Sequence, residues 1–261
     1  MIDLHCHLLP GIDDGPETIA GSLELARAAV AAGTRMMVAT PHVSWSYPND
    51  ADTIGPRVDE LRARLRAEGI ALEVRAGAEI AMTRVADLAP AELSRLSLGG
   101  GEWLLVEPPF APTVTGLDSI LFDLQRQGHR VLLAHPERCQ AFHRDPRMLQ
   151  SLVRAGVLTS ITAGSLVGRF GGEVRRFALS LARDGLIHNV ASDAHDTLRR
   201  PPGTAVELRQ AGLEPLAAWL TEQVPAAILS GEEIPPRPVE ELPELERSRR
   251  LWRPRRLSRR S

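Results

Sequence analysis

The chain begins Met1-Ile2-Asp3-Leu4-His5-Cys6-His7, a short apolar segment that ends in two histidines. Side chains alternate between the two faces of a strand, so His5 and His7 share one face and Cys6 points to the other. Two imidazoles on one side of a strand end are a ready chelate for a divalent metal ion. The segment therefore predicts a strand that carries metal ligands at its carboxyl end.

The same rhythm continues along the chain, where short apolar segments alternate with longer amphipathic ones. The predicted strands are Ile2–Cys6, Arg35–Ala39, Ala71–Ala76, Trp103–Val106, Arg130–Ala134, Val157–Thr162 and Ile187–Ala191. The predicted helices include Thr18–Ala32, Ala51–Arg66, Leu117–Gln127 and Glu173–Arg183. Strand–helix alternation indicates a parallel α/β sheet. Its repetition within 261 residues favours a closed β/α barrel, although the alternation also fits an open doubly wound sheet.

Potential metal ligands follow the strands in succession. They are His5 and His7, Asp13 and Asp14 in the loop 11–16, His42, Glu79, Glu107, His135, Asp193 and His195. A single Asp after a strand is usually a helix cap. Several consecutive strand ends with such a residue are a stronger signal, because the carboxyl ends of barrel strands converge on the face that holds active sites.

The ligand types limit the choice of ion. Imidazole and carboxylate without thiolate suit Mn, Fe, Zn or Mg. The set exceeds what one ion can take, so the sequence predicts two or three divalent ions. Metal ions about 3.5–4 Å apart can activate a bridging water and hold a phosphoryl group.

Bulk composition excludes some classes of partner. The net charge is −2, so the chain as a whole lacks the signature of a nucleic-acid-binding protein. The start has neither the basic nor the apolar region of a signal peptide, and no apolar run approaches the ~20 residues of a membrane span. Two cysteines are too few for a disulfide framework. We expect a cytoplasmic protein.

The composition changes after Pro235. Residues 247–261 hold eight Arg and no acid, which is typical of a solvated tail and also fits an extension that meets an acidic partner or a membrane surface. We therefore predict a barrel domain over residues 1–235 and a Pro- and Arg-rich extension over residues 236–261.

The motifs at the strand ends resemble those of the polymerase-and-histidinol-phosphatase (PHP) metallohydrolase superfamily. Within it, the sequence is most similar to bacterial manganese-dependent tyrosine-protein phosphatases of capsular and exopolysaccharide loci. The matching motifs are Asp3-Leu4-His5-Cys6-His7, Gly11-Ile12-Asp13-Asp14-Gly15-Pro16, Thr40-Pro41-His42, Gly77-Ala78-Glu79-Ile80, His135-Pro136-Glu137-Arg138, Ser192-Asp193-Ala194-His195 and Arg200-Pro201-Pro202. They run in family order across about residues 1–230.

The resemblance implies a distorted (β/α)7 barrel of the PHP type, similar to a TIM barrel, that holds three metal ions, with Mn²⁺ expected. The implied ligands are His5, His7, Glu79 and Asp193 for one ion, Glu79, Glu107 and His135 for the second, and Asp14, His42 and His195 for the third. Arg138 and Arg200 match the phosphate-binding arginines of the family. These two side chains are the expected catalytic and substrate-binding residues.

The function implied is hydrolysis of phosphotyrosine on a protein, expected to be the phosphorylated tail of a tyrosine kinase that controls capsule or exopolysaccharide synthesis. The membrane would be involved only indirectly, through that kinase. The alternatives are a small-molecule phosphatase, such as one for histidinol phosphate, and a metal-binding adaptor without catalysis.

A cysteine-dependent phosphatase is disfavoured. Its chemistry needs a nucleophilic Cys with Arg six positions later, in a phosphate cradle at a helix N-terminus. Ile12 lies six positions after Cys6, and Asp145 lies six positions after Cys139.

Overall fold

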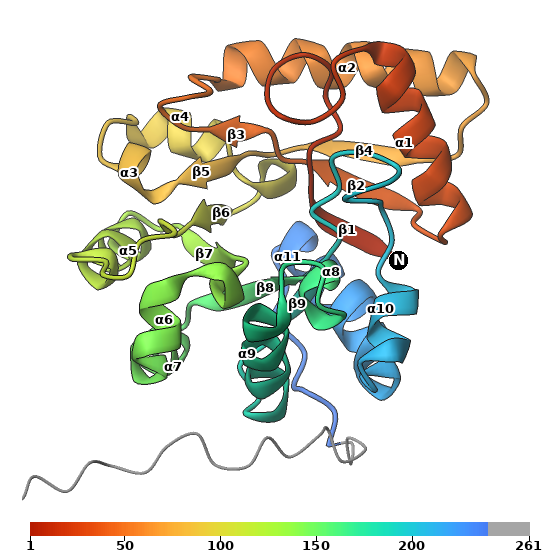
Figure 1. Ribbon diagram of the computed structural model, residues 1–261. Helices are drawn as coiled ribbons and strands as arrows, with labels where there is room; N and C mark the ends of the chain where they lie inside the picture. The colour runs from red at the N-terminus through yellow and green to blue at the C-terminus, as the bar shows by residue number, and fades with distance from the viewer. Residues whose placement is uncertain (240–261) are drawn as a thin grey trace, which may run out of the picture.

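The computed structural model describes residues 1–239, in which helices surround a set of parallel strands (Figure 1). The strands are β1 (Ile2–Cys6), β2 (Met36–Ala39), β3 (His42–Val43), β4 (Glu73–Ala76), β5 (Glu79–Ala81), β6 (Trp103–Glu107), β7 (Arg130–Ala134), β8 (Leu158–Thr162) and β9 (Asn189–Ala191). The α-helices are α1 (Ile19–Ala31), α2 (Ala51–Ala67), α3 (Met82–Val85), α4 (Pro90–Arg95), α5 (Leu117–Arg126), α6 (Gln140–Arg144), α7 (Pro146–Arg154), α8 (Ala163–Leu166), α9 (Gly172–Arg183), α10 (Ala205–Gln210) and α11 (Val224–Ser230). Short turns of other helix types are η1 (Leu98–Gly100), η2 (Pro136–Arg138), η3 (Glu214–Leu216) and η4 (Trp219–Gln223).

The strands form two parallel sheets, which confirms the parallel α/β class. One sheet has the order β1-β2-β4 and the other β3-β5-β6-β7-β8-β9. The hydrogen-bonded strands are therefore not one closed sheet. The division falls where β2 leads into β3 through Thr40-Pro41 and β4 into β5 through Gly77-Ala78. Pro41 has no N–H to donate to a ladder, which interrupts the pairing there.

Each of the seven predicted strands is present, with its start shifted by at most two residues and its end by at most one. The four predicted helices are also present, and the first begins at Ile19 with Thr18 as its N-cap, whose side chain accepts a hydrogen bond from Gly21 N. The sequence analysis did not predict β3 and β5, which hold only two and three residues.

The strands are buried along most of their length. Every residue of β1, β2 and β9 is buried, and β6 is buried except at its last residue, Glu107. Parallel strands covered on both faces are expected to read as continuous apolar runs, as Leu104-Leu105-Val106 and Val131-Leu132-Leu133 do. The packed strands therefore provide a rigid platform for the polar side chains at their carboxyl ends.

The predicted extension over residues 236–261 lies outside the described residues except for positions 236–239. In that part, Arg237 Nη2 donates to Ala182 O at 3.0 Å, and just before it Pro235 O accepts from Trp219 Nε1 at 2.9 Å. None of the helices within residues 1–239 has the length and apolar character needed to cross a bilayer.

Candidate metal centre

Four side chains from three strands bring their donor atoms close together. His5 and His7 come from β1, Glu79 begins β5, and Asp193 follows β9. The Nε2 atoms of the histidines lie 3.2–3.5 Å from Glu79 Oε2 and Asp193 Oδ1, and 3.3 Å from each other. Ligands about 2.1 Å from a central ion in a tetrahedral arrangement are about 3.4 Å apart. The spacing of His5, His7 and Asp193 therefore fits a divalent ion, and Glu79 lies next to the two histidines.

The acceptor atoms in this cluster are not used elsewhere. Glu79 Oε2 and Asp193 Oδ1 are buried and make no hydrogen bond, and the same holds for His195 Nε2 nearby. A buried polar atom without a partner carries a free-energy penalty. The donors thus fit a bound cation, which would satisfy them together.

Glu79 joins this cluster to a second group of residues. Its Oε1 lies 2.7 Å from His135 Nε2, while its Oε2 faces His5 and His7. Glu107 Oε1 lies 3.7 Å from His135 Nε2, and Glu107 also groups with His42 and Glu79 at ligand-like spacing. The two oxygens of Glu79 are therefore placed to serve two neighbouring ions.

A third group lies on the other side of His7. Asp14 Oδ1 is 3.2 Å from His195 Nε2 and 3.4 Å from His42 Nε2. Together with His7 these residues form a set of four with ligand-like spacing. All nine ligands that the family resemblance implies therefore belong to one continuous cluster at the strand ends.

The two predicted arginines meet at the far oxygen of Asp193. Arg200 Nη2 lies 2.5 Å from Asp193 Oδ2, and Arg138 Nη1 lies 3.0 Å from the same atom. Both side chains are partly buried, at 24% and 20% exposure. Two guanidinium groups thus flank the cluster of candidate ligands on one side, an arrangement that suits anion recognition.

Three polar residues to which the family resemblance assigned no role support this site. Asp13 Oδ2 accepts from His7 Nδ1 at 2.7 Å, which turns Nε2 of that ring toward the cluster. Thr162 Oγ1 donates to Asp193 Oδ2 at 3.3 Å. Glu137 is fully buried, and its Oε1 accepts from Thr162 N and Ser165 Oγ, so it ties the Arg138 loop to the end of β8.

The protonation states of Asp193, Glu79 and His135 favour metal binding, whereas neighbouring carboxylates raise the pKa of His7 and His42. Burial alone would raise the pKa of the Asp193 and Glu79 carboxyls, but neighbouring imidazoles hold the pKa of both well below the usual range, and Arg200 adds to this effect at Asp193. Burial lowers the pKa of His135 to about 4. Ionised carboxylates and neutral imidazoles are the forms that bind metal ions.

Glu107 differs from the other carboxylates. Burial and the nearby Glu79 raise the pKa of its carboxyl to about 7. The carboxylate cluster therefore carries excess negative charge at this point, which a cation would neutralise.

Two residues of the ligand cluster have strained backbone conformations. His135 has φ +28° and Asp193 has φ +52°, and they are the only non-glycine residues with positive φ within residues 1–239. His135 directly follows β7, Asp193 lies two residues after β9, and both contribute to the cluster. Strained conformations outside glycine persist only where the surrounding structure enforces them, and they concentrate at functional sites.

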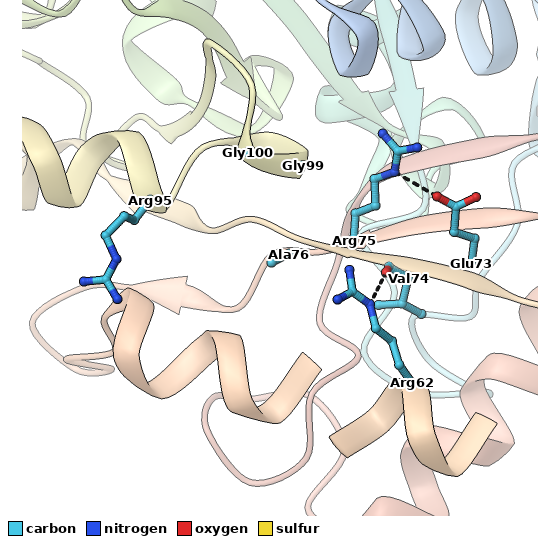
Figure 2. A pocket seen from close by; sticks show the side chains of 8 residues that line it. All are labelled: Arg62, Glu73, Val74, Arg75, Ala76, Arg95, Gly99 and Gly100. Carbon is cyan, nitrogen blue, oxygen red and sulfur yellow. Dashed lines mark hydrogen bonds and ion pairs between the residues drawn. The ribbon is translucent and has the colours of Figure 1, made fainter. Parts of the chain in front are cut away.

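A hollow beside β4 differs in chemistry from the cluster at the strand ends (Figure 2). Arg62, Arg75 and Arg95 line it, but their donors are used locally. Arg75 Nε bonds to Glu73 at 2.9 Å, Arg62 Nε donates to Val74 O at 2.8 Å, and Arg95 pairs with Glu92 and Asp52. No histidine lines this hollow, so it offers none of the metal-ligand chemistry of the strand ends.

The two cysteines should be dispensable for catalysis. Both thiols are buried, and burial raises the pKa of each, whereas a nucleophilic cysteine needs a lowered pKa. We expect Cys6→Ser and Cys139→Ser to keep kcat/KM within about threefold of the unmodified protein, measured after metal loading is matched. A folded, fully loaded variant without activity would contradict this expectation.

A parallel α/β fold with a buried cluster of His, Asp and Glu at its strand ends defines an α/β metallohydrolase. The family model described as "Capsular polysaccharide synthesis, CpsB/CapC" matches residues 1–211. The chain belongs to this family.

Similar proteins support the assignment. The tyrosine-protein phosphatase YwqE of Bacillus subtilis (strain 168) is 40% identical over 201 residues, covering 77% of this chain and 79% of the relative. The putative tyrosine-protein phosphatase CapC of Staphylococcus aureus is 32% identical over 205 residues, with 77% and 79% covered. A solved structure from work on YwqE and on CpsB of Streptococcus pneumoniae, described as metal-dependent tyrosine phosphatases, matches with a TM-score of 0.80 and 37% identity, covering 92% of this chain and 100% of that one.

Proposed function

We propose that this protein is a metal-dependent protein-tyrosine phosphatase that hydrolyses phosphotyrosine on a kinase controlling capsule or exopolysaccharide synthesis. One observation carries the proposal. Asp193 directs Oδ1 toward His5 and His7 and Oδ2 toward two guanidinium groups, so metal ligation and anion recognition meet at one side chain. The names of the relatives, tyrosine-protein phosphatases, agree with it.

The proposed ligands follow the three groups of donor atoms. His5, His7, Glu79 and Asp193 would hold one ion, Glu79, Glu107 and His135 a second, and Asp14, His42 and His195 a third. The spacing of His5, His7 and Asp193 and of Asp14, His42 and His195 supports the first and third groups, whereas in the second group His135 is spaced with His5 and Glu79, and Glu107 with His42 and Glu79. Bound ions would supply an activated water at neutral pH and neutralise charge on the phosphoryl group. We propose Mn²⁺, with Fe, Zn and Mg as the competing ions.

The chain's own residues would bind and orient the phosphate ester. Arg138 and Arg200 present planar donors that suit two phosphoryl oxygens. Asp193 holds both guanidinium groups beside the metal ligands, so little reorganisation is needed when charge develops on those oxygens. The phenol of tyrosine, with a pKa of about 10, leaves more readily than an alkoxide, so little acid assistance is required.

We further propose that the two sheets act as one distorted (β/α)7 barrel. Asp193 N donates to His5 O and His7 N donates to Ala194 O, both at 2.9 Å, so the first and last strands join by backbone bonds. If β2 with β3 and β4 with β5 are each counted as one interrupted strand, seven strand positions result.

Substrate choice decides between the proposed function and its alternatives. We expect the manganese-loaded protein to hydrolyse a phosphotyrosine peptide with a kcat/KM at least about tenfold above that for the matched phosphoserine peptide or for histidinol phosphate. The reason is that a better leaving group lowers the activation free energy of hydrolysis. Steady-state kinetics on the three substrates, repeated after reconstitution with Mn, Fe, Zn or Mg, measure this preference.

The other outcomes lead to different functions. Faster hydrolysis of histidinol phosphate would assign a small-molecule phosphatase. Stoichiometric metal binding without turnover of any of the three esters would assign an adaptor. A kinase as the partner is tested by whether the protein removes phosphate from the phosphorylated tail of a tyrosine kinase encoded beside it.

A further inference from the structure

Aromatic side chains gather in the loops that follow the strands. The chain has ten aromatic residues. Tyr47, its only tyrosine, follows β3, Phe110 follows β6, and Phe170 follows β8 and the short helix α8. We call these three residues the aromatic rim. They lie after the strands that bear His42, Glu107 and Thr162, so the rim shares the strand ends with the metal cluster.

Each residue of the aromatic rim contacts a residue of the proposed site. The Tyr47 ring stacks on His42, with centroids 5.5 Å apart and planes 10° from parallel. The Phe110 ring stacks on His135 at 5.6 Å and 15°. Phe170 lies 4.6 Å from the guanidinium carbon of Arg138 and 5.9 Å from that of Arg200. Aromatic rings therefore border the candidate ligands His42 and His135 and both arginines.

Within the aromatic rim, Phe110 is held by contacts with two site residues and still exposes part of its surface to solvent. Its ring lies 4.9 Å from the guanidinium carbon of Arg138 as well as against His135, yet 44% of the residue is exposed. The preceding Pro108-Pro109 fixes φ at two successive positions. Cys139 Sγ donates to Pro109 O at 3.3 Å, which anchors the loop to the neighbouring strand end.

We propose that Phe110 forms an aryl subsite, in which its ring packs against the phenyl ring of the substrate and determines specificity for aryl over alkyl phosphate esters. The inference rests on the proposed function. A phosphoryl group bound by Arg138 places its ester oxygen, and the ring attached to it, close to Phe110. Ring pairs are favourable at centroid separations of about 4.5–7 Å. An alkyl ester, such as that of phosphoserine, has no ring to make this contact.

A positioning role is the competing account. Phe110 packs on Arg138, so its loss could simply misplace the guanidinium. In that case every phosphate ester, and inorganic phosphate as well, would bind more weakly. An aryl subsite affects only ligands that carry a ring, so the two accounts separate when aryl and alkyl ligands are compared in the same variant.

The experiment uses the manganese-loaded full chain and its Phe110→Leu, Phe110→Tyr and Phe122→Leu variants. Phe122 lies in α5 and serves as a control for loss of a ring elsewhere. The kcat/KM is measured for phenyl phosphate and glycerol 2-phosphate, and inhibition by inorganic phosphate is measured alongside. Calorimetry with phenylphosphonate and methylphosphonate gives a binding readout that needs no turnover.

For Phe110→Leu we expect kcat/KM for phenyl phosphate and affinity for phenylphosphonate to fall about fivefold to tenfold, the size of one ring–ring contact. The alkyl ligands and inorganic phosphate should change less than twofold, Phe110→Tyr should restore the aryl preference, and Phe122→Leu should match the unmodified protein. Equal losses on aryl and alkyl ligands, or no loss on either, would overturn the subsite. If the unmodified protein hydrolyses neither ester, the proposed function fails. The phosphonate affinities then still decide whether Phe110 distinguishes a ring.

Discussion

Asp193→Ala should lower kcat/KM for a phosphotyrosine peptide by about 10³-fold or more, because one side chain performs two tasks. Its Oδ1 completes the set of donors with His5 and His7, and its Oδ2 holds Arg138 and Arg200. Loss of a single preorganised donor to a developing oxyanion costs about 10²–10³-fold. Removal of a ligand together with the anchor of two such donors should cost at least that much.

Metal content is the second readout for this substitution. We expect elemental analysis to find at least one ion per chain fewer in Asp193→Ala than in the unmodified protein. Because Asp193 is buried and the substitution leaves Arg138 and Arg200 without this partner, thermal unfolding must be measured in parallel. Asp193→Asn keeps the shape of the side chain and removes its charge, so it should lose metal and activity even if the alanine variant unfolds.

An exposed aspartate provides the matched control for the Asp193 substitutions. Asp87→Ala removes a carboxylate that the structure places at the surface, after helix α3, and it should leave both activity and metal content unchanged. A folded Asp193→Asn variant that retains full metal content and turnover would remove Asp193 from the site, and with it the link between metal binding and anion recognition.

Much of the fold follows from the apolar pattern. Segments such as Val131-Leu132-Leu133 are buried on both faces and have no other stable place than the centre of a parallel sheet. The two strands that were missed, His42–Val43 and Glu79–Ala81, are short and carry site residues, so their polar members mask the apolar pattern. The division into two sheets depends on backbone geometry around Pro41 and Gly77, which periodicity does not encode.

The metal ligands were recognisable because chemistry limits them to a few residue types at strand ends. The residues that support these ligands could not be recognised from the sequence. Thr162 and Glu137 act through hydrogen bonds to Asp193 and to the end of β8, which depend on which strands become neighbours. Phe170 lies between Gly168 and Gly171, both with positive φ, and its contact with two arginines arises from that turn. An apolar residue in a loop carries no sequence signal for such a role.

Arg200→Ala should lower kcat/KM by about 10²-fold, while Arg199→Ala should change it less than about twofold. The two residues are adjacent, but only Arg200 reaches the site, where Nη2 lies 2.5 Å from Asp193 Oδ2 and Nη1 lies 3.9 Å from Asp14 Oδ2. Arg199 is exposed, and its backbone N–H donates a hydrogen bond to Asp196 Oδ1. The expected loss is that of one preorganised donor to the phosphoryl oxygens.

The expected difference in kcat/KM between Arg200→Ala and Arg199→Ala should not arise from a loss of folding stability. Without Arg200, Asp193 Oδ2 still accepts from Arg138 Nη1 and Thr162 Oγ1, so thermal unfolding and metal content should stay close to those of the unmodified protein. Arg138→Ala should resemble Arg200→Ala, and Arg200→Lys should recover only part of the activity because a lysine lacks the planar pair of donors. Weaker inhibition by inorganic phosphate should accompany the loss. Equal damage from Arg199→Ala and Arg200→Ala would mean that the loop contributes through its overall charge, and the assignment of Arg200 to phosphate binding would be wrong.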